Sequence, residues 1–285
     1  AVDSGSDVVE PDAAALDDAG GGPFLFGVDH DPSQQRGPVV LWFGPEGTDP
    51  AEAIVSAEWR DGTDGPWAPC TPLNGYQGVG KYVWDSMADT QDDLSSVSLR
   101  LEMVTDTGEH GVSSAEPFAL YNDPARARQV LLTHDINGDD RVRQLTWTHG
   151  AGLGGVGGDP AGVVHTIGAS PRRVAYSPNG ALAAVVEEGS EHIRILRFDL
   201  ETGALSGQST IPAPGLYPVD TEFGGDGADL YVVHSNPGPE GGVYRVPIRP
   251  VGGGALDGQA FAQIHSQFQA GDLEILPGGR GLALL

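Results

Sequence analysis

The chain has one cysteine, Cys70, in 285 residues. A single cysteine excludes an internal disulfide and any zinc site built from several cysteines, so we expect Cys70 to be a packed thiol. Basic residues are also scarce, because 15 Lys and Arg stand against 40 Asp and Glu, for a formal net charge of −25. Such a charge repels nucleic-acid phosphates and anionic membrane surfaces, and we expect neither as a partner. No apolar run approaches the ~18 residues of a membrane-spanning helix.

Glycine and proline, by contrast, are abundant, with 43 and 22 residues. They follow no collagen-like period. Glycine and proline in these numbers would also interrupt helices. Placed between short apolar segments, they indicate many short strands joined by turns. The sequence therefore predicts an all-β protein, long enough for two domains.

Residues 1–22 are acidic and rich in small side chains, and they have no apolar period. Such a segment buries too little surface to offset its chain entropy, and we expect a disordered acidic tail. The segment resembles the spacer behind the anchoring cysteine of bacterial surface lipoproteins, although that cysteine is not in this sequence. The resemblance implies an extracellular, cell-surface or periplasmic location in a bacterium.

Residues 23–122 read as about seven short strands. In Val97–Val104 the apolar residues alternate with Ser98, Arg100 and Glu102, which is the period of a half-buried strand. This pattern over about 100 residues predicts an antiparallel sandwich. With Trp59–Gly62 and Tyr82–Ser86, the segment resembles the fibronectin III-like and immunoglobulin-like modules of bacterial surface proteins. Its four tryptophans could form a ligand platform, but core packing is the expectation we favour.

The second half contains three copies of one unit, at Val130–Leu153, Ala183–Leu205 and Leu230–Leu256. Each has an apolar strand, a polar loop, an alternating strand and a glycine-containing turn that ends in Leu. Trp147, Phe198 and Ile248 hold matching places, 51 and 50 residues apart. A period of about 40–50 residues in β-rich sequence is typical of propeller blades, including repeats of the WD40 and YVTN type.

Residues 126–285 are therefore expected to form a partial β-propeller of about three and a half four-stranded blades. The best-formed unit has predicted strands at 172–177, 181–186, 192–198 and 206–211, and the next at 218–223, 230–234, 243–248 and 259–264. A last pair is predicted at 272–276 and 281–285. The first unit is expected to have only three strands. A seven-bladed ring needs roughly 350 residues, so we expect an open arc and a chain that is a fragment of a longer protein.

The stretch from Pro171 to Leu205 resembles the seven-bladed lactonase propellers, a family that includes 6-phosphogluconolactonase-like and muconate-cyclising proteins. The matching residues are Pro171–Arg173, Tyr176–Gly180, Val185–Glu188 and Gly203–Leu205. The resemblance implies that Arg172 holds a carboxylate or phosphate of the substrate and that Glu188 is the general acid or base. It also demands a histidine from an inner strand that this chain lacks, which favours a structural ion pair over catalysis.

The loops after the second strands are expected to gather on one face, where propellers usually bind ligands. They place His134, Asp135, Glu187 and His234 on that face. Within the first loop, Asp135, Asn137 and Asp139 have the spacing of a calcium loop. However, Asp140 replaces the glycine at the sixth position and Thr146 the glutamate at the twelfth, so an ordinary acidic loop is the favoured alternative.

The sequence thus leaves three functions open. The first is a secreted or surface-exposed bacterial binding or scaffold protein without a cofactor, whose partner is a protein, a carbohydrate or a small molecule. The second is a lactonase-type hydrolase whose remaining blades lie outside this chain. The third is an adhesion module that depends on Ca²⁺. We favour the first, because the histidine that the lactonase resemblance demands is missing.

Overall fold

The computed structural model describes a nearly all-β chain. The described residues are 26–29, 34–45, 54–75, 77, 80–105, 108–126, 128–133, 141–148, 152–155, 162–168, 170–213, 217–235, 239, 241–251, 255–257, 262–266, 273–275 and 282–284. The predicted acidic tail, residues 1–22, lies outside them. None of the described helices is long and apolar enough to cross a membrane.

The N-terminal half contains a three-stranded and a five-stranded sheet. The first has the order β1 (Phe26–Asp29), β3 (Pro38–Pro45), β6 (Lys81–Asp85). The second has the order β2 (Gln34–Gln35), β8 (His110–Tyr121), β7 (Asp93–Val104), β4 (Ile54–Asp61), β5 (Ala68–Pro69). A single turn of helix, α1 (Ser86–Asp89), follows β6. All pairings are antiparallel except β2 with β8.

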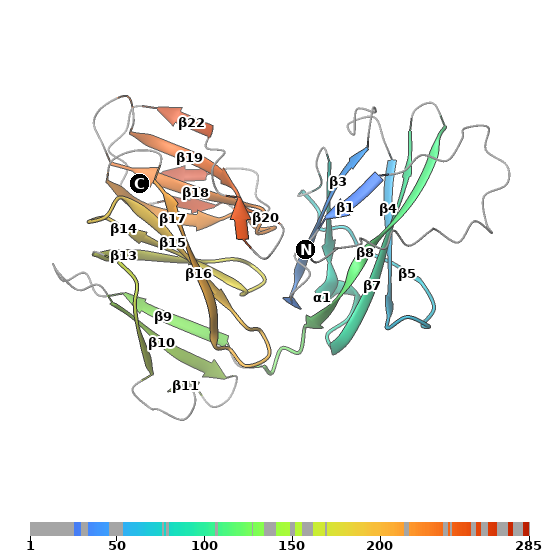
Figure 1. Cartoon of the computed structure of the whole chain (residues 1–285), viewed down its shortest axis with the longest axis horizontal. Helices are drawn as coiled ribbons and strands as arrows, with labels where there is room; N and C mark the ends of the chain where they lie inside the picture. The colour runs from blue at the N-terminus through green and yellow to red at the C-terminus, as the bar shows by residue number, and fades with distance from the viewer. Residues whose placement is uncertain are drawn as a thin grey trace, which may run out of the picture.

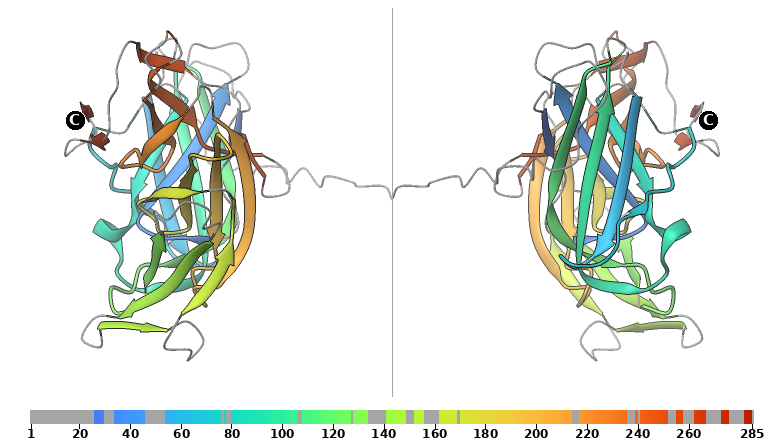
Figure 2. Two further views of the ribbon diagram at one scale, coloured as in Figure 1. Left: turned by 90° about the vertical axis from the view of Figure 1, so that its left-hand side faces the viewer. Right: turned by 90° about the vertical axis from the view of Figure 1, so that its right-hand side faces the viewer.

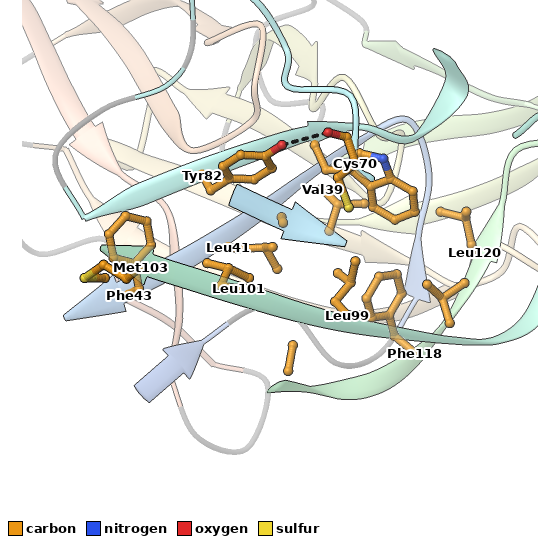
Figure 3. Close-up of a cluster of buried hydrophobic side chains, with 14 residues drawn as sticks. Val39, Leu41, Phe43, Cys70, Tyr82, Leu99, Leu101, Met103, Phe118 and Leu120 are labelled. Atoms are coloured by element: carbon orange, nitrogen blue, oxygen red, sulfur yellow. Dashed lines mark hydrogen bonds between the residues drawn. The ribbon is translucent and has the colours of Figure 1, made fainter. Parts of the chain in front are cut away.

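The two sheets share one hydrophobic core (Figure 3). Val97, Leu99, Leu101 and Met103 of β7 are each fully buried, as their alternation predicted. They pack with side chains from β3, β6 and β8. Burying one such side chain contributes about 1.5–3 kcal/mol, so this core accounts for the cohesion of the N-terminal half. Assignment to the immunoglobulin or fibronectin III class stays a prediction.

Cys70 and two of the tryptophans belong to this core. Cys70 is a buried free thiol, and its burial raises the pKa of that thiol. Tyr82 donates its hydroxyl to the Cys70 carbonyl oxygen at 2.9 Å (Figure 3). Trp84 is fully buried, and the half-buried Trp59 stacks on it with ring centroids 5.6 Å apart. Core packing of these two tryptophans is therefore confirmed.

The described residues of the C-terminal half form five further sheets. Four of them are numbered here in chain order, and the fifth is a two-stranded hairpin that precedes the last strand of sheet 3. Sheet 1 contains β9 (Arg128–Thr133), β10 (Arg141–Thr148), β11 (Gly152–Gly155) and β12 (Val163–Thr166). Sheet 2 has the order β13 (Pro171–Tyr176), β14 (Leu182–Glu187), β15 (His192–Phe198), β16 (Leu205–Pro212). Sheet 3 has the order β17 (Pro218–Phe223), β18 (Asp229–His234), β19 (Gly242–Pro247), β22 (Ala262–Ser266). Sheet 4 pairs β23 (Leu273–Ile275) with β24 (Leu282–Leu284).

Sheet 2 shows why these residues form antiparallel hairpins. The turn from β13 to β14 is closed by Asn179, whose side-chain oxygen accepts from the Ala181 amide at 3.1 Å, and by Gly180 at φ 71°. Asn and Gly suit such a turn because Gly adopts positive φ without steric cost. Every residue of β14 is buried, as expected of a strand covered on both faces.

Sheet 1 differs in detail from the three-stranded unit predicted for it. β9 pairs along one edge of β10, while β11 and β12 pair with successive halves of the other edge. The sheet is thus three strands wide, with its last position divided between two short strands. The pattern also did not predict the hairpin of β20 (Arg249–Val251) and β21 (Ala255–Asp257) that precedes β22.

Sheets 1 to 4 stack in chain order. Figure 1 shows the first three of them, sheets 1, 2 and 3. The first strands touch one another across the stack, β9 with β13, β13 with β17, and β17 with β23. Sheets 1 and 2 share a core that includes Val142 and Phe198, and sheets 2 and 3 share one that includes Ile195 and Val232. Each sheet except those at the two ends is thus buried between its neighbours.

The two halves lie side by side and are held by charged contacts (Figures 1 and 2). Lys81 on β6, the single lysine of the chain, forms an ion pair with Asp226 in the turn between β17 and β18. Its side chain is 13% exposed and that of Asp226 is 4% exposed. Arg126 in the connection between the halves donates to the Glu201 carbonyl oxygen at 2.9 Å. The contacts from the N-terminal half therefore reach hairpin turns at one end of sheets 2 and 3.

Candidate functional site at the open end of sheet 2

The candidate site lies at the end of sheet 2 where β13 begins, β14 ends and β15 begins. Successive hairpin turns of an antiparallel sheet alternate between its two ends. The β15–β16 turn, which contains Glu201, contacts the N-terminal half. The β14–β15 turn at residues 188–191 therefore lies at the opposite end, away from that contact. This end is here called the open end of sheet 2. Arg172, Glu187 and Glu188 all come from this opposite end.

A β-bulge places Arg172 there. Pro171 pairs with Glu187 and Arg173 pairs with Val186, so Arg172 is an extra residue in β13. The preceding residue, Ser170, adopts φ 57°, and its carbonyl oxygen accepts from the Glu188 amide at 3.2 Å. Bulges redirect the side chain of the inserted residue. This local geometry brings the residue after Pro171 next to the residue after Glu187.

Arg172 and Glu188 form an ion pair at that position. The Arg172 Nη1 donates to Glu188 Oε2 at 2.7 Å, and their side chains are 39% and 36% exposed. The Arg172 backbone carbonyl oxygen also accepts from the Thr133 hydroxyl of sheet 1 at 3.3 Å. A half-exposed pair of this kind contributes about 0–1 kcal/mol to folding. Its chemical importance is that a guanidinium and a carboxylate are presented together to solvent.

Glu187, directly before Glu188, is instead an interior residue with a 1% exposed side chain. Its carboxylate accepts from Arg194 Nε at 2.8 Å and from the Ser190 hydroxyl at 2.7 Å. A second nitrogen of Arg194 donates to the Ile167 carbonyl oxygen at 2.7 Å. Buried carboxylates are retained only when paired and hydrogen-bonded, and this one is both. Glu187 therefore fixes the β14–β15 turn beneath the exposed pair.

Gly168 leaves the space that the Glu187 carboxylate occupies. A Cβ atom built on Gly168 would stand 2.1 Å from Glu187 Oε2 and 2.3 Å from its Cδ. Any side chain at position 168 would therefore displace the buried carboxylate. The site thus depends on a glycine in the segment that leads from sheet 1 into β13.

Sheet 3 repeats the backbone of this site with different side chains. Tyr217 has φ 58°, its carbonyl oxygen accepts from the Ser235 amide at 3.1 Å, and Pro218 pairs with His234 before a bulge. His234 of sheet 3 thus occupies the position that Glu187 occupies in sheet 2. His234 is fully buried, and its ring packs edge-on against the ring of Tyr244, with the ring centroids 5.1 Å apart. Because the same backbone geometry occurs in both sheets, the positive φ of Ser170 and Tyr217 is a feature of the repeated fold. Sheet 2 differs from sheet 3 at this position only in its side chains.

Arg172 and Glu188, the two catalytic candidates, are in contact. Glu187 was predicted for the ligand face, but its side chain lies in the interior, where it pairs with Arg194. His234 occupies the corresponding place on the next sheet, with its side chain in the interior. His134, Asp135, Asn137 and Asp139 lie outside the described residues, so the calcium loop stays a prediction. Within the described part of the chain, no three His, Cys, Asp or Glu side chains are grouped as metal ligands.

Three residues that shape the site were not predicted from the sequence. They are Gly168, Ser190 and Arg194. The only signal available was the phase of β15, in which Arg194 falls on the same face as the buried Leu196. A charged residue at an inward position requires a buried partner of opposite charge. That reasoning would have connected Arg194 to a carboxylate, although not to Glu187 in particular.

Comparison with known proteins gives likeness in structure only. No protein-family model matches the chain, and no curated protein matches it by sequence. Among solved structures, the chain is similar to a Bacteroides fragilis protein provisionally named a 6-phosphogluconolactonase, at TM-score 0.41 and 13% identity over 92% of this chain and 73% of that one. It is also similar to a Bacteroides uniformis protein of the same provisional name, at TM-score 0.35 and 16% identity over 81% and 88%. Sqt1 of Chaetomium thermophilum, solved bound to the N-terminus of ribosomal protein L10, gives TM-score 0.37 and 14% identity over 92% and 71%.

Proposed function

We propose that residues 126–285 form part of a lactonase-like β-propeller in a secreted or surface-exposed bacterial protein that binds a ligand without transforming it. The stacking of sheets in chain order supports the propeller arrangement, because each sheet buries the next around its first strand. The formal charge of −25 suits a soluble protein in a cation-rich exterior. The proposed binding surface is the open end of sheet 2.

The observation that carries the proposal is the exposed pair of Arg172 and Glu188, 2.7 Å apart. Arg172 offers a planar fork of donors that fits a carboxylate, and Glu188 offers acceptors that fit hydroxyl groups. A ligand with both groups, such as a sugar acid, would replace the contact between Arg172 and Glu188. Its carboxylate would bind Arg172, and its hydroxyl groups would bind Glu188. The ligand class is therefore a polyhydroxylated carboxylic acid.

The layer beneath the pair supports binding because it is already ordered. Glu187 is held by Arg194 and Ser190, and the Glu188 amide is held by Ser170. Side chains and backbone fixed before a ligand arrives reduce the entropy lost on binding. The surface thus meets the requirement for recognition of a small polar molecule.

A second candidate function is hydrolysis of a lactone. The observation that favours it is that Arg172 and Glu188, which the lactonase resemblance assigns to the active site, are direct neighbours. In that case Arg172 would hold an anionic group of the substrate and Glu188 would transfer the proton. The two candidates share the same residues and differ in whether a bound lactone is turned over.

The test measures aldonic-acid binding by calorimetry and hydrolysis of the corresponding lactone, for the wild type and for Arg172→Gln and Glu188→Gln. Arg173→Gln is the matched control, because Arg173 is the exposed neighbour on the same strand. We expect binding that Arg172→Gln weakens about tenfold or more, that Arg173→Gln leaves unchanged, and that occurs without turnover. If the wild type hydrolyses the lactone and Glu188→Gln abolishes that hydrolysis, the protein is a hydrolase and the binding proposal is wrong. Neither binding nor turnover would contradict both candidates.

A further inference from the structure

Arg36 is an interior arginine that forms no ion pair with any of the described residues. It directly follows β2 and is 5% exposed. Within the described part of the chain its guanidinium makes a single hydrogen bond, from Nη2 to the Asp123 carbonyl oxygen at 3.4 Å. Its Nε is enclosed and has no partner. A guanidinium carries several N–H donors, and interior charges are normally paired, so Arg36 lacks the compensation that its burial requires.

The backbone on both sides of Arg36 is fixed. On one side, β2 ends at Gln35 and pairs in parallel with β8. On the other side, the Gly37 amide donates to the Asn122 side-chain oxygen at 2.9 Å. Asn122 is fully buried, and its own amide nitrogen donates to the Ser86 hydroxyl at 2.9 Å. The backbone therefore holds the Arg36 side chain in the interior before any ligand arrives.

The connection from β8 to β9, which passes from one half to the other (Figure 1), brings two more arginines near Arg36. The Arg126 amide donates at 3.2 Å to the same Asp123 carbonyl oxygen that accepts from Arg36. Arg128 begins β9, and its exposed side chain has no hydrogen bond or ion pair within the described residues. Burial and the positive charges of Arg128 and Arg126 lower the pKa of Arg36. Positive charge is thus gathered where the chain crosses between its halves.

The carboxylates near Arg36 are bonded to other groups. Asp93 and Asp123 act on its charge in the opposite direction from the two arginines. However, Asp93 is ion-paired with Arg126, whose Nε donates to its Oδ2 at 2.9 Å. The Asp123 carboxylate accepts from the Ala125 amide at 2.8 Å. Three guanidinium groups therefore meet two carboxylates, which leaves a local excess of positive charge in a chain of formal net charge −25.

We propose that a small inorganic oxyanion, phosphate or sulfate, binds at Arg36 between the two halves of the chain. Nε is the one nitrogen of Arg36 that is both enclosed and unbonded, so the Nη groups are the part that a ligand can reach. Arg128 would supply a second guanidinium from the other half, and Arg126 would contribute mainly its charge. A tetrahedral oxyanion accepts from donors on several sides, which fits guanidinium groups that come from both halves. Because Arg36 is 5% exposed, the site suits a free ion rather than the phosphate of a larger molecule.

Arg60 shows how a similar arginine is accommodated without a ligand. Its Nε is also enclosed without a hydrogen bond. Its guanidinium, however, lies over the Trp67 ring, 4.3 Å from the ring centroid, and the attraction between cation and ring compensates the charge. Among the described residues, no aromatic ring stands in that relation to Arg36. Arg60 is therefore a matched control for substitutions at Arg36.

The experiment is thermal unfolding of the full chain at increasing concentrations of phosphate, with sodium chloride holding the ionic strength constant. We expect the unfolding midpoint of the wild type to rise and the rise to saturate, because an ion that binds only the folded state stabilises it. Arg36→Met should fold, since it removes an uncompensated interior charge, and should weaken phosphate binding about tenfold or more. Arg60→Met should keep the full response. Any general stabilising effect of phosphate on proteins would be the same in both variants.

Two further variants locate the ion. Arg128→Gln, at an exposed position, should also weaken phosphate binding, and it decides the question if Arg36→Met does not fold. Arg172→Gln should leave the response unchanged, because this inference does not depend on ligand binding at the open end of sheet 2. A wild type without a saturable response would overturn the proposal. So would a full response in Arg36→Met or Arg128→Gln, or a response lost in Arg172→Gln, which would place the phosphate at sheet 2.

Discussion

Gln144 illustrates, at the scale of single residues, how a polar group is accommodated between two sheets. Its side chain lies in the interior at 1% exposure. The amide nitrogen donates to the Gln129 side chain and to the Gly203 carbonyl oxygen, both at 2.6 Å. The amide oxygen is 2.7 Å from His165 Nε2, which therefore carries the proton and donates. This network links sheet 1 to the β15–β16 turn of sheet 2.

His165 makes the stability of this network depend on pH. Burial lowers the pKa of His165 below its ordinary value. The unfolded chain therefore binds a proton at a pH at which the folded chain does not, and stability falls as the pH drops through about 6.5. We expect His165→Asn to be less sensitive to this change than the wild type. Urea unfolding at about pH 7.5 and about pH 5.5 measures the difference.

His192→Asn, a half-buried histidine of sheet 2, is the control for that comparison. The wild type and His192→Asn should lose similar stability between the two pH values, and His165→Asn should lose less. Equal losses for the wild type and His165→Asn would show that His165 does not contribute to the pH dependence.

At the scale of elements, sequence pattern predicted strands better than the contacts between them. The predicted strands 192–198 and 218–223 match β15 and β17, and the others of sheets 2 and 3 lie within three residues at each end. Alternation and turn residues are local signals, which is why they succeed. The division of the last strand of sheet 1 and the β20–β21 hairpin gave no such signal, because glycine-rich stretches have little side-chain period.

The candidate site was only partly predictable for the same reason. The resemblance singled out Arg172 and Glu188, and the structure shows them in contact. The bulge that brings them together depends on the pairing of β13 with β14, which is a relation between distant residues. Likewise, no local pattern connects Gly168 to Glu187, because their proximity arises from the path of the chain between sheets. Register and stacking therefore had to come from the structure.

The Gly168 contact gives a prediction for the segment that leads into β13. Gly168→Ala should destabilise the protein by about 1–3 kcal/mol or more, because the new Cβ overlaps the buried Glu187 carboxylate. Gly207→Ala on β16 is the matched control, since a Cβ there meets nothing within 4 Å. Denaturant unfolding of the two variants measures the difference. Equal stabilities would contradict the geometry described for Glu187.

At the scale of the whole molecule, the two halves have separate cores and are joined mainly by polar contacts. Among the described residues, the buried core of the N-terminal half comes from residues 39–120, with Val28 packed against it, and the buried cores of the C-terminal half come from residues 131–273. Between them, the ion pair of Lys81 and Asp226 is largely buried. Asp226 also accepts from the Ala228 amide at 3.0 Å, which shapes the turn that Lys81 contacts.

Removing the lysine from this pair should therefore cost much more than removing a surface charge. Lys81→Met leaves a nearly buried carboxylate without its cation, and we expect a loss of about 3–5 kcal/mol. The double variant Lys81→Met with Asp226→Asn should recover part of that loss, because no buried charge then remains. Arg100→Met is the control, since the pair of Arg100 and Glu58 is 38% exposed on both sides. A Lys81→Met loss no larger than that of Arg100→Met would contradict a buried link between the halves.

The stacking of sheets in chain order is the claim on which the proposed propeller and the proposed binding surface at the open end of sheet 2 both depend. Sheets 2 and 3 share a core to which Ala184 and Ile195 contribute from one side and Val232 and Val246 from the other. Nuclear Overhauser spectroscopy on methyl-labelled protein tests this most directly. The structure predicts cross-peaks between the methyl groups of these two sets. Their absence, with both sheets folded, would contradict the account.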